Sequence, residues 1–285
     1  KYDGSIKPIL EQANKLCNAD FELSPHQLFV KNFLSYNTPY NSLLLYHGLG
    51  TGKTCSAIGV CEEQRDYLNQ MGIEKRTLIV ASPNVQDNFR LQLFDKRKLN
   101  KVDGQWVITG CIGNKLLNEI NPMNMKGITR EKVIQQINNI INNSYMFVGY
   151  NEFANYVEKV LQVRGEFDSE EEKEMVQKRN MKYEFDGRLI VIDEVHNLNE
   201  DNKLAPMLTK VVLYTQNVRL LLLSATPMYN SYKEVIWLLN LMNMNDGRGI
   251  LNTRDVFEKD GSFKKGKGQE NEGEELLLRK ATGYV

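Results

Sequence analysis

The chain has 285 residues, of which 41% are hydrophobic and 25% are charged, so its composition is that of a globular protein able to bury a sizeable core. Its 36 basic and 36 acidic residues balance, so any nucleic-acid partner must be held by a local surface and not by the net charge. No apolar run approaches the ~20 residues that a membrane span needs. We therefore expect a soluble protein with no membrane partner.

The cysteines give no sign of a metal site or of a disulfide framework. Cys17, Cys55, Cys61 and Cys111 form no C-x-x-C pair and show no metal-type spacing with the three histidines. We predict four free thiols, which indicates an intracellular, reducing compartment.

The first chemical motif is LLLYHGLGTGKTCSAIGV, residues 43–60. A predicted strand, Ser42–Tyr46, leads through a glycine-rich turn into a predicted helix, Thr54–Asn69. Glycines let backbone N–H groups approach phosphate oxygens, and the helix directs its N-terminal dipole at the same anion. His47 stands where the strict pattern G-x-x-x-x-G-K-S/T has its first glycine, so a tight turn without a ligand is the alternative. The candidate nucleotide-binding residues are Gly48, Gly50, Thr51, Gly52, Lys53 and Thr54.

Strands and helices continue to alternate along the chain. Further strands are predicted at Thr77–Ala81, Trp106–Thr109 and Tyr145–Val148, and further helices at Val85–Phe94, Arg130–Asn142 and Asn151–Val163. Strands that are apolar throughout are typical of a parallel sheet buried on both faces. The asparagines of INNIINNS (Ile137–Ser144) have the abundance expected of an AT-rich genome.

An acidic pair follows the next predicted strand, Leu189–Ile192. The charge-dense segment before it, Glu166–Arg188, predicts a solvated helix or a mobile insertion. RLIVIDEVHNL then delivers Asp193 and Glu194 at the carboxyl end of the strand, where ligands bind in open α/β sheets. In such a site the Asp holds Mg²⁺ through its water shell, and the Glu orients and deprotonates the attacking water. The alternative is an Asp-Glu pair that only begins a helix. The candidate metal ligands are Thr54, Asp193 and Glu194.

A third motif, LLLLSATPMYN, begins with a predicted strand at Leu220–Leu223 and continues into Ser224 and Thr226. Alone, Ser and Thr after a strand usually cap or turn the chain. A helix is predicted at Tyr232–Met242, and Asp255–Gly273 predicts a surface loop or the start of a connector. The regular alternation of strand and helix predicts a doubly wound α/β fold with a mainly parallel sheet.

The three motifs in this order resemble the first RecA-like domain of superfamily 2 helicases and translocases of the DExH type. LSPHQLFVKNFL, residues 23–34, is similar to the Gln motif of Swi/Snf-type remodellers. The resemblance implies a phosphate-loop NTPase that uses ATP and Mg²⁺, with Gln27 reading the adenine edge through both amide groups. Without the resemblance, Gln27 is an ordinary exposed helix residue. The catalytic residues implied are Lys53, Asp193, Glu194, Ser224 and Thr226.

NTPYNSLLLYHGLGTGKTCSAIGV also looks like the helicase-like ATPases of large DNA viruses, among them the nucleoside triphosphatase I and early transcription factor relatives of poxviruses. Such proteins often carry His at the position of His47, which implies a true phosphate cradle. The resemblance covers roughly residue 23 to the end. It implies a viral protein that acts in transcription, in the virion or the cytoplasm of an infected cell.

The resemblance also places a nucleic-acid track beside the nucleotide site. TLIVASPNVQDNFR matches motif Ia, in which Ser82 and Pro83 open a helix whose N-terminus can hold a backbone phosphate. Arg90 adds a charge contact or simply lies on a solvated helix face. Such backbone contacts predict binding that tolerates any sequence and is sensitive to salt.

YMFVGYNEFANYV resembles the next nucleic-acid motif. Relatives usually have Ser or Thr where Gly149 stands, so a backbone N–H would have to replace the missing hydroxyl. Tyr150 is either a stacking platform or core packing. Nothing in the sequence distinguishes DNA from RNA.

By resemblance, a second RecA-like domain supplies the arginine finger, which contributes on the order of 10³–10⁵ in rate in other phosphate-loop enzymes. Nothing after Thr226 resembles its motifs. We expect residues 1–22 to form an N-terminal extension, 23–245 the ATP-binding domain, and 246–285 a surface loop and the start of a connector. Both ends are expected to be cuts through a longer protein, and this chain alone is expected to be poorly active.

Three hypotheses follow. The first is the ATPase half of a nucleic-acid-dependent motor. The second is a transcription-factor subunit that uses the fold as a nucleotide- and partner-binding scaffold within a transcription complex. The third is another phosphate-loop enzyme, such as a nucleotide kinase, which needs no SAT element and should carry an arginine-rich lid.

Overall fold

The fold is seen in a computed structural model of the chain. It describes residues 24–46, 48, 52–123, 125–165, 167–198, 203–227, 232–266 and 271–285. Among the residues singled out above, Cys17, His47, Gly50 and Thr51 lie outside the described residues.

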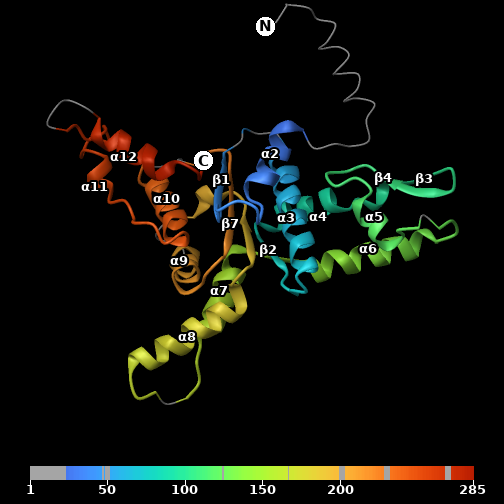
Figure 1. The fold of residues 1–285 in the computed structure, drawn as a ribbon, viewed down its shortest axis with the longest axis horizontal. Helices are drawn as coiled ribbons and strands as arrows, with labels where there is room; N and C mark the ends of the chain where they lie inside the picture. The colour runs from blue at the N-terminus through green and yellow to red at the C-terminus, as the bar shows by residue number, and fades with distance from the viewer. Residues whose placement is uncertain are drawn as a thin grey trace, which may run out of the picture.

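A five-stranded parallel sheet forms the centre of the molecule (Figure 1), in the order β1-β7-β6-β2-β5. Its strands are β1 (Ser42–Tyr46), β2 (Thr77–Val80), β5 (Tyr145–Val148), β6 (Leu189–Ile192) and β7 (Arg219–Ser224). β2, β6 and β7 are buried along their whole length, as their continuous apolar runs predict, while the edge strands β1 and β5 each contain residues that are exposed or partly buried. The predicted α/β fold class is confirmed.

Helices cover both faces of the sheet. One face packs against α2 (Pro25–Phe33), α3 (Lys53–Gln70), α4 (Pro83–Leu93), α5 (Lys115–Ile120) and α6 (Arg130–Ser144). The other face packs against α7 (Tyr150–Leu161), α8 (Glu170–Phe185), α9 (Leu204–Tyr214) and α10 (Lys233–Asn245), with α11 (Thr253–Val256) and α12 (Glu272–Ala281) beyond them. Within the described ranges, no helix is long and apolar enough to cross a membrane.

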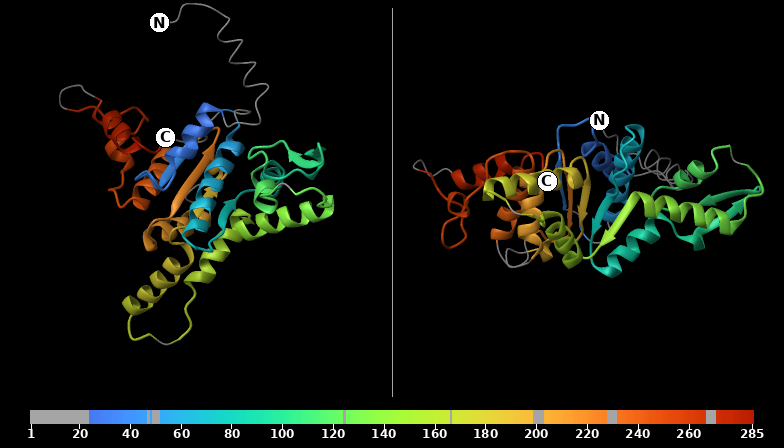
Figure 2. Two further views of the ribbon diagram at one scale, coloured as in Figure 1. Left: turned by 45° about the vertical axis from the view of Figure 1, so that its right-hand side comes forward. Right: turned by 90° about the horizontal axis from the view of Figure 1, so that it is seen from below.

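The strand predicted near Trp106 is not part of the central sheet. It is β4 (Gln105–Ile108), which pairs antiparallel with β3 (Leu99–Val102) in a separate two-stranded ribbon. The ribbon follows the 3-10 turn η1 (Lys96–Lys98) and projects away from the sheet in both views of Figure 2. Only its ends, Leu99 and Ile108, are buried. A run of three apolar residues cannot by itself distinguish such a ribbon from a core strand.

Of the two segments predicted to be exposed, the charged segment Glu166–Arg188 is largely helical. Asp255–Gly273 is helical only at its two ends among the residues that the structure describes, as the prediction of a surface loop requires. The charged segment forms α8, which buries Met181 and Phe185, so the solvated-helix alternative is confirmed. The C-terminal segment forms α11 and α12 and returns to the sheet, where Tyr284 is buried. The Tyr284 carbonyl accepts the Leu44 N–H at 2.6 Å on the free edge of β1.

The prediction of free thiols is wrong for two of the four cysteines. Cys55, at the start of α3, and Cys111, after β4, form a disulfide with a Cα–Cα distance of 5.1 Å. They are 56 residues apart, so no local spacing marked the pair. Cys61 is free and buried. The argument for a reducing compartment therefore loses its support from this pair.

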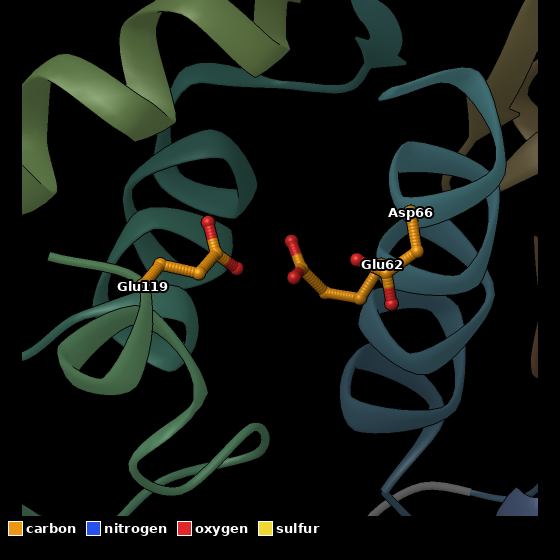
Figure 3. Close-up of side chains that lie close together, drawn as sticks. All are labelled: Glu62, Asp66 and Glu119. Carbon is orange, nitrogen blue, oxygen red and sulfur yellow. The ribbon is translucent and has the colours of Figure 1, made fainter. Parts of the chain in front are cut away.

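Three carboxylates, Glu62, Asp66 and Glu119, face one another between α3 and α5 (Figure 3). Two cations lie among them. Arg65 binds Glu62 at 2.6 Å and also Glu119, while Lys115 lies 2.8 Å from both Glu62 and Asp66. The cluster is an ion-pair network that ties the helices together, and each of its three carboxylates is paired with Arg65 or Lys115.

The buried Glu62 should contribute to stability in a pH-dependent way. Burial by itself raises the pKa of Glu62, but hydrogen bonds from Arg65 and the charge of Lys115 outweigh it and hold the pKa below its ordinary value. A lowered pKa means that the charged form stabilises the fold above the ordinary pKa of a glutamate. This stability is lost as the pH falls towards the lower pKa of the folded state.

Glu62→Gln should lower the free energy of unfolding at neutral pH by about 3 kcal/mol, because it removes the buried carboxylate that Arg65 and Lys115 share. It should also flatten the acid limb of the stability curve, measured by urea unfolding between pH 3 and 7. The control is Glu63→Gln on the same helix, where a partly exposed pair with Lys31 is lost. Its effect should stay below about 1 kcal/mol. Equal losses in the two variants would contradict the assignment.

Candidate functional site

The carboxyl ends of the strands bring the three sequence motifs together. β7 lies between β1 and β6, with Tyr46 opposite Ser224 and Leu222 opposite Ile192. The segments that follow these three strands therefore leave the sheet side by side. This is the edge at which open α/β sheets bind ligands.

Gly52 closes the turn before α3 in a conformation that favours glycine. Its φ is +81°, and a Cβ atom there would lie 2.6 Å from the Gln27 Nε2 atom. That amide donates to the Gly52 carbonyl at 3.4 Å, while its Oε1 accepts the Ser24 N–H at 3.1 Å. Gln27 is therefore a buried residue that touches the glycine turn and not an exposed helix residue. Its reading of adenine stays a prediction.

Lys53 presents a buried charge at the start of α3. Its Nζ atom is buried, and no hydrogen-bond partner reaches it within the part of the chain that the structure describes. A buried ammonium group without a partner is unfavourable. The N–H groups of the first turn of α3 point in the same direction, towards the place where an anion binds at a helix N-terminus. Lys53 and its helix thus suit the phosphates of a nucleotide, with Thr54 beside them.

The acidic pair lies at the end of β6. Burial raises the pKa of Asp193, and the Glu194 N–H at 2.9 Å and the nearby charge of Lys53 oppose this shift. The Asp193 carboxylate is thus largely desolvated. A cation bound there would offset the cost of burying this negative charge. Carboxylate oxygens are among the ligands that Mg²⁺ prefers.

Glu194 stands in the left-handed region, with φ of 49° and ψ of 50°. A non-glycine residue there is uncommon and is often found at functional sites. Its Oε2 atom lies 3.3 Å from the Nδ1 atom of His196, which in turn lies 3.0 Å from the Ser224 hydroxyl. The Ser224 hydroxyl also accepts the N–H of Thr226 at 3.0 Å. A chain of polar contacts thus connects the acidic pair with the SAT element.

Sequence reasoning gave no role to His196, although it is part of the quoted DEVH motif. It also missed the contact of Tyr150, whose hydroxyl donates to the Asp193 carbonyl at 2.8 Å. Tyr150, the first residue of α7, is partly buried and packs against the core. This contact supports the packing alternative for Tyr150 and links the end of β5 to the acidic pair.

The other predicted nucleic-acid residues lie at the same edge or on the helix that leads from it. Ser82 and Pro83 begin α4 as its N-cap and first residue. The Gly149 N–H, expected to replace a missing hydroxyl, donates to the Glu152 carboxylate at 2.8 Å, so a phosphate would compete with a negative charge. The exposed Arg90 stacks over the Phe147 ring at 4.0 Å.

A comparison with family models identifies the chain. A model described as the SNF2-related domain matches residues 26–279. The chain belongs to the SNF2-related domain family. This match confirms the resemblance to Swi/Snf-type ATPases, and the kinase hypothesis loses its basis.

The relatives of this SNF2-related domain are viral proteins. A candidate ATP-dependent RNA helicase of Acanthamoeba polyphaga mimivirus is 25% identical over 97% of this chain and 24% of its own length. A candidate helicase of Frog virus 3 is 25% identical over 84% of this chain and 22% of its own length. An early transcription factor large subunit homolog of African swine fever virus is 26% identical over 78% of this chain and 24% of its own length. The chain thus spans about a quarter of the length of these relatives.

Among solved structures, the SWI2/SNF2 ATPase core of Sulfolobus solfataricus in complex with double-stranded DNA covers 94% of this chain. The match covers 45% of that chain, with 16% sequence identity and a TM-score of 0.46.

Tyr150→Phe should lower the free energy of unfolding by about 1 kcal/mol, because it removes one hydrogen bond from the Asp193 carbonyl and keeps the ring. Urea unfolding measures the difference. Tyr183→Phe on α8 is the matched control, because Tyr183 is 84% exposed. If the two variants were equally stable, the hydrogen bond from the Tyr150 hydroxyl to the Asp193 carbonyl would not contribute to stability.

Proposed function

We propose that this SNF2-related domain is the ATP-binding half of a nucleic-acid-dependent ATPase that acts as a helicase or translocase. The observation that carries the proposal is the buried ammonium group of Lys53, which has no hydrogen-bond partner among the described residues, and the nearby desolvated carboxylate of Asp193. Two opposite charges held out of water at a strand edge are expected where a triphosphate and a cation bind together.

The nucleotide is held by the turn and by the start of α3. Backbone N–H groups of Gly48, Gly50, Thr51 and Gly52 cradle the phosphates, and Lys53 neutralises their charge. Thr54, Asp193 and Glu194 form the cation site. A Mg²⁺ ion held there supplies positive charge to the phosphate oxygens.

Glu194 acts as the general base. It accepts a proton from the water whose oxygen forms the new bond to the γ-phosphorus, while the bond between that phosphorus and the bridging oxygen breaks to release ADP and phosphate. His196 positions this base: because a carboxylate only accepts, the His196–Glu194 bond requires a proton on Nδ1. The Ser224 hydroxyl lies 3.0 Å from the same Nδ1 atom, and the Thr226 N–H donates to that hydroxyl and fixes its position.

The nucleic acid lies beside this site. Ser82 and Pro83 offer the N-terminus of α4 to a backbone phosphate, with the exposed Arg90 about two turns further along the helix. Gly149 and Tyr150 line the neighbouring corner, where Tyr150 contacts Asp193. Binding at this corner would therefore be transmitted to the catalytic acids through one hydrogen bond.

The remaining assignments concern the longer protein. Residues 1–22 precede the domain as an extension, and 23–245 form the ATP-binding domain. Residues 246–285, which pack on that domain and reach β1 through Tyr284, lead to a second RecA-like domain that completes the site. The similarity to an early transcription factor subunit homolog supports a role in viral transcription, within a transcription complex in the virion or the infected cell.

The decisive experiment is Glu194→Gln in the full-length protein. Steady-state ATP turnover, with saturating nucleic acid, should fall by at least about 10²-fold because the general base is lost. Nucleotide affinity, measured by titration calorimetry, should remain within a few-fold. The control is Glu171→Gln. Glu171 is an exposed glutamate on α8 that is not assigned to the site, so this variant should leave turnover unchanged.

Two outcomes would contradict the proposal. Unchanged function of Glu194→Gln in transcription would favour the scaffold hypothesis. If the wild-type protein hydrolysed no ATP with single-stranded or duplex DNA or RNA, the proposed ATPase activity would be wrong.

The isolated chain should hydrolyse ATP at least about 10³-fold more slowly than the full-length protein, because the arginine finger comes from the second domain. A colorimetric phosphate assay of both proteins, each with and without nucleic acid, measures this. Full motor rates from the isolated chain would show that the site is complete without that domain.

A further inference from the structure

The exposed face of α6 is lined by amide side chains at helical spacing. Gln135, Asn138, Asn139, Asn142 and Asn143 are all exposed. Their offsets of three, four, seven and eight residues place them on one face of the helix. The opposite face buries Val133, Ile137 and Ile141 in the core. The asparagines noted in the sequence therefore form an ordered stripe and are not a scattered excess.

Basic residues lie at both ends of this stripe. At the N-terminal end of α6, a groove of about 540 Å³ is lined by Lys96, Arg97 and Arg130 together with the amides from Gln135 to Asn139. At the C-terminal end, a groove of about 550 Å³ is lined by Lys75 and Arg76 together with Asn142 and Asn143. One α-helix thus joins two basic grooves.

Some of these charges are already engaged. Arg97 is paired with Asp95, and the Lys75 ammonium donates to two backbone carbonyls. Arg130 is exposed and donates to the Lys96 carbonyl at 2.6 Å. Lys96 and Arg76 are also exposed, and no ion pair involves any of these three residues among the residues that the structure describes. Glu131 and Glu74 are the only acidic residues that line the two grooves.

We propose that the amide stripe of α6, with the basic grooves at its two ends, is a second binding surface for the backbone of a nucleic acid. Amide and basic side chains are the groups that contact phosphate and sugar oxygens. A protein-binding face of this size would instead need an apolar centre. The helix is 15 residues long, or about 22 Å, which spans about six base steps at 3.4 Å.

This surface is distinct from the track beside the nucleotide site. The groove at the C-terminal end of α6 includes Thr77 and Ser144, which lie at the start of β2 and just before β5. Those are the amino ends of the strands, opposite the edge that carries Asp193. The inference rests on the proposed nucleic-acid dependence and extends the contact of the same strand or duplex along the side of the domain.

Opposite charges placed on the stripe give the sharpest test. In the full-length protein, Asn139→Glu with Asn142→Glu should weaken binding of a labelled 30-mer, single-stranded or duplex, by about tenfold at 100 mM salt, measured by fluorescence anisotropy. Asn139→Lys with Asn142→Lys should tighten it and steepen the salt dependence by about one to two units of log K per log salt. Glutamate and lysine have helix propensities at least as high as that of asparagine, so neither double variant should unfold α6. Basal ATP turnover should not change.

Met175→Glu and Met175→Lys on α8 are the matched controls, since Met175 is a 70% exposed helix residue. If the α6 variants bind nucleic acid as the Met175 variants do, the inference is wrong while the proposed function stands. If the wild-type protein binds no nucleic acid at all, both fail.

Discussion

Parallel strands that pair in register must leave the sheet at a common edge, and the site depends on that geometry. Here β7 lies between β1 and β6. The SAT element therefore stands between the glycine turn and the acidic pair, although it comes last of the three in the sequence. This order brings His196, which follows β6 and lies 3.3 Å from Glu194, to 3.0 Å from Ser224 at the end of β7. A different strand order would have kept the same motifs and separated their side chains.

Buried charge is handled in two opposite ways in this molecule. Between α3 and α5, Glu62 is surrounded by Arg65 and Lys115, so its charge is balanced within the chain. One end of the same helix carries Lys53, whose ammonium group is buried without a partner among the described residues. Burying an unpaired charge is unfavourable, and a ligand of opposite charge removes that penalty. The closed network holds α3 in place, and the open end of α3 is left for a ligand.

The surface also combines a neutral net charge with a locally basic region. Basic and acidic residues are equal in number over the chain, so attraction to a polyanion has to come from local groups. The exposed face of α6 offers such groups, with Arg130 and Lys96 at one end and Arg76 at the other. Amides between them contribute hydrogen-bonding capacity without adding repulsion.

The sequence by itself determined the elements whose signals are local. Continuous apolar runs defined the five central strands, and short motifs defined Gly52, Lys53, Asp193 and Ser224, because each motif lies within a few residues of a strand end. Contacts between distant residues could not be predicted in this way. The disulfide joins residues 56 apart, Tyr150 reaches Asp193 across 43, and His196 reaches Ser224 across 28. Likewise, the three apolar residues of β4 do not indicate which strand they pair with. These features were decided only by the tertiary structure, because they depend on which elements the packing of the core brings into contact.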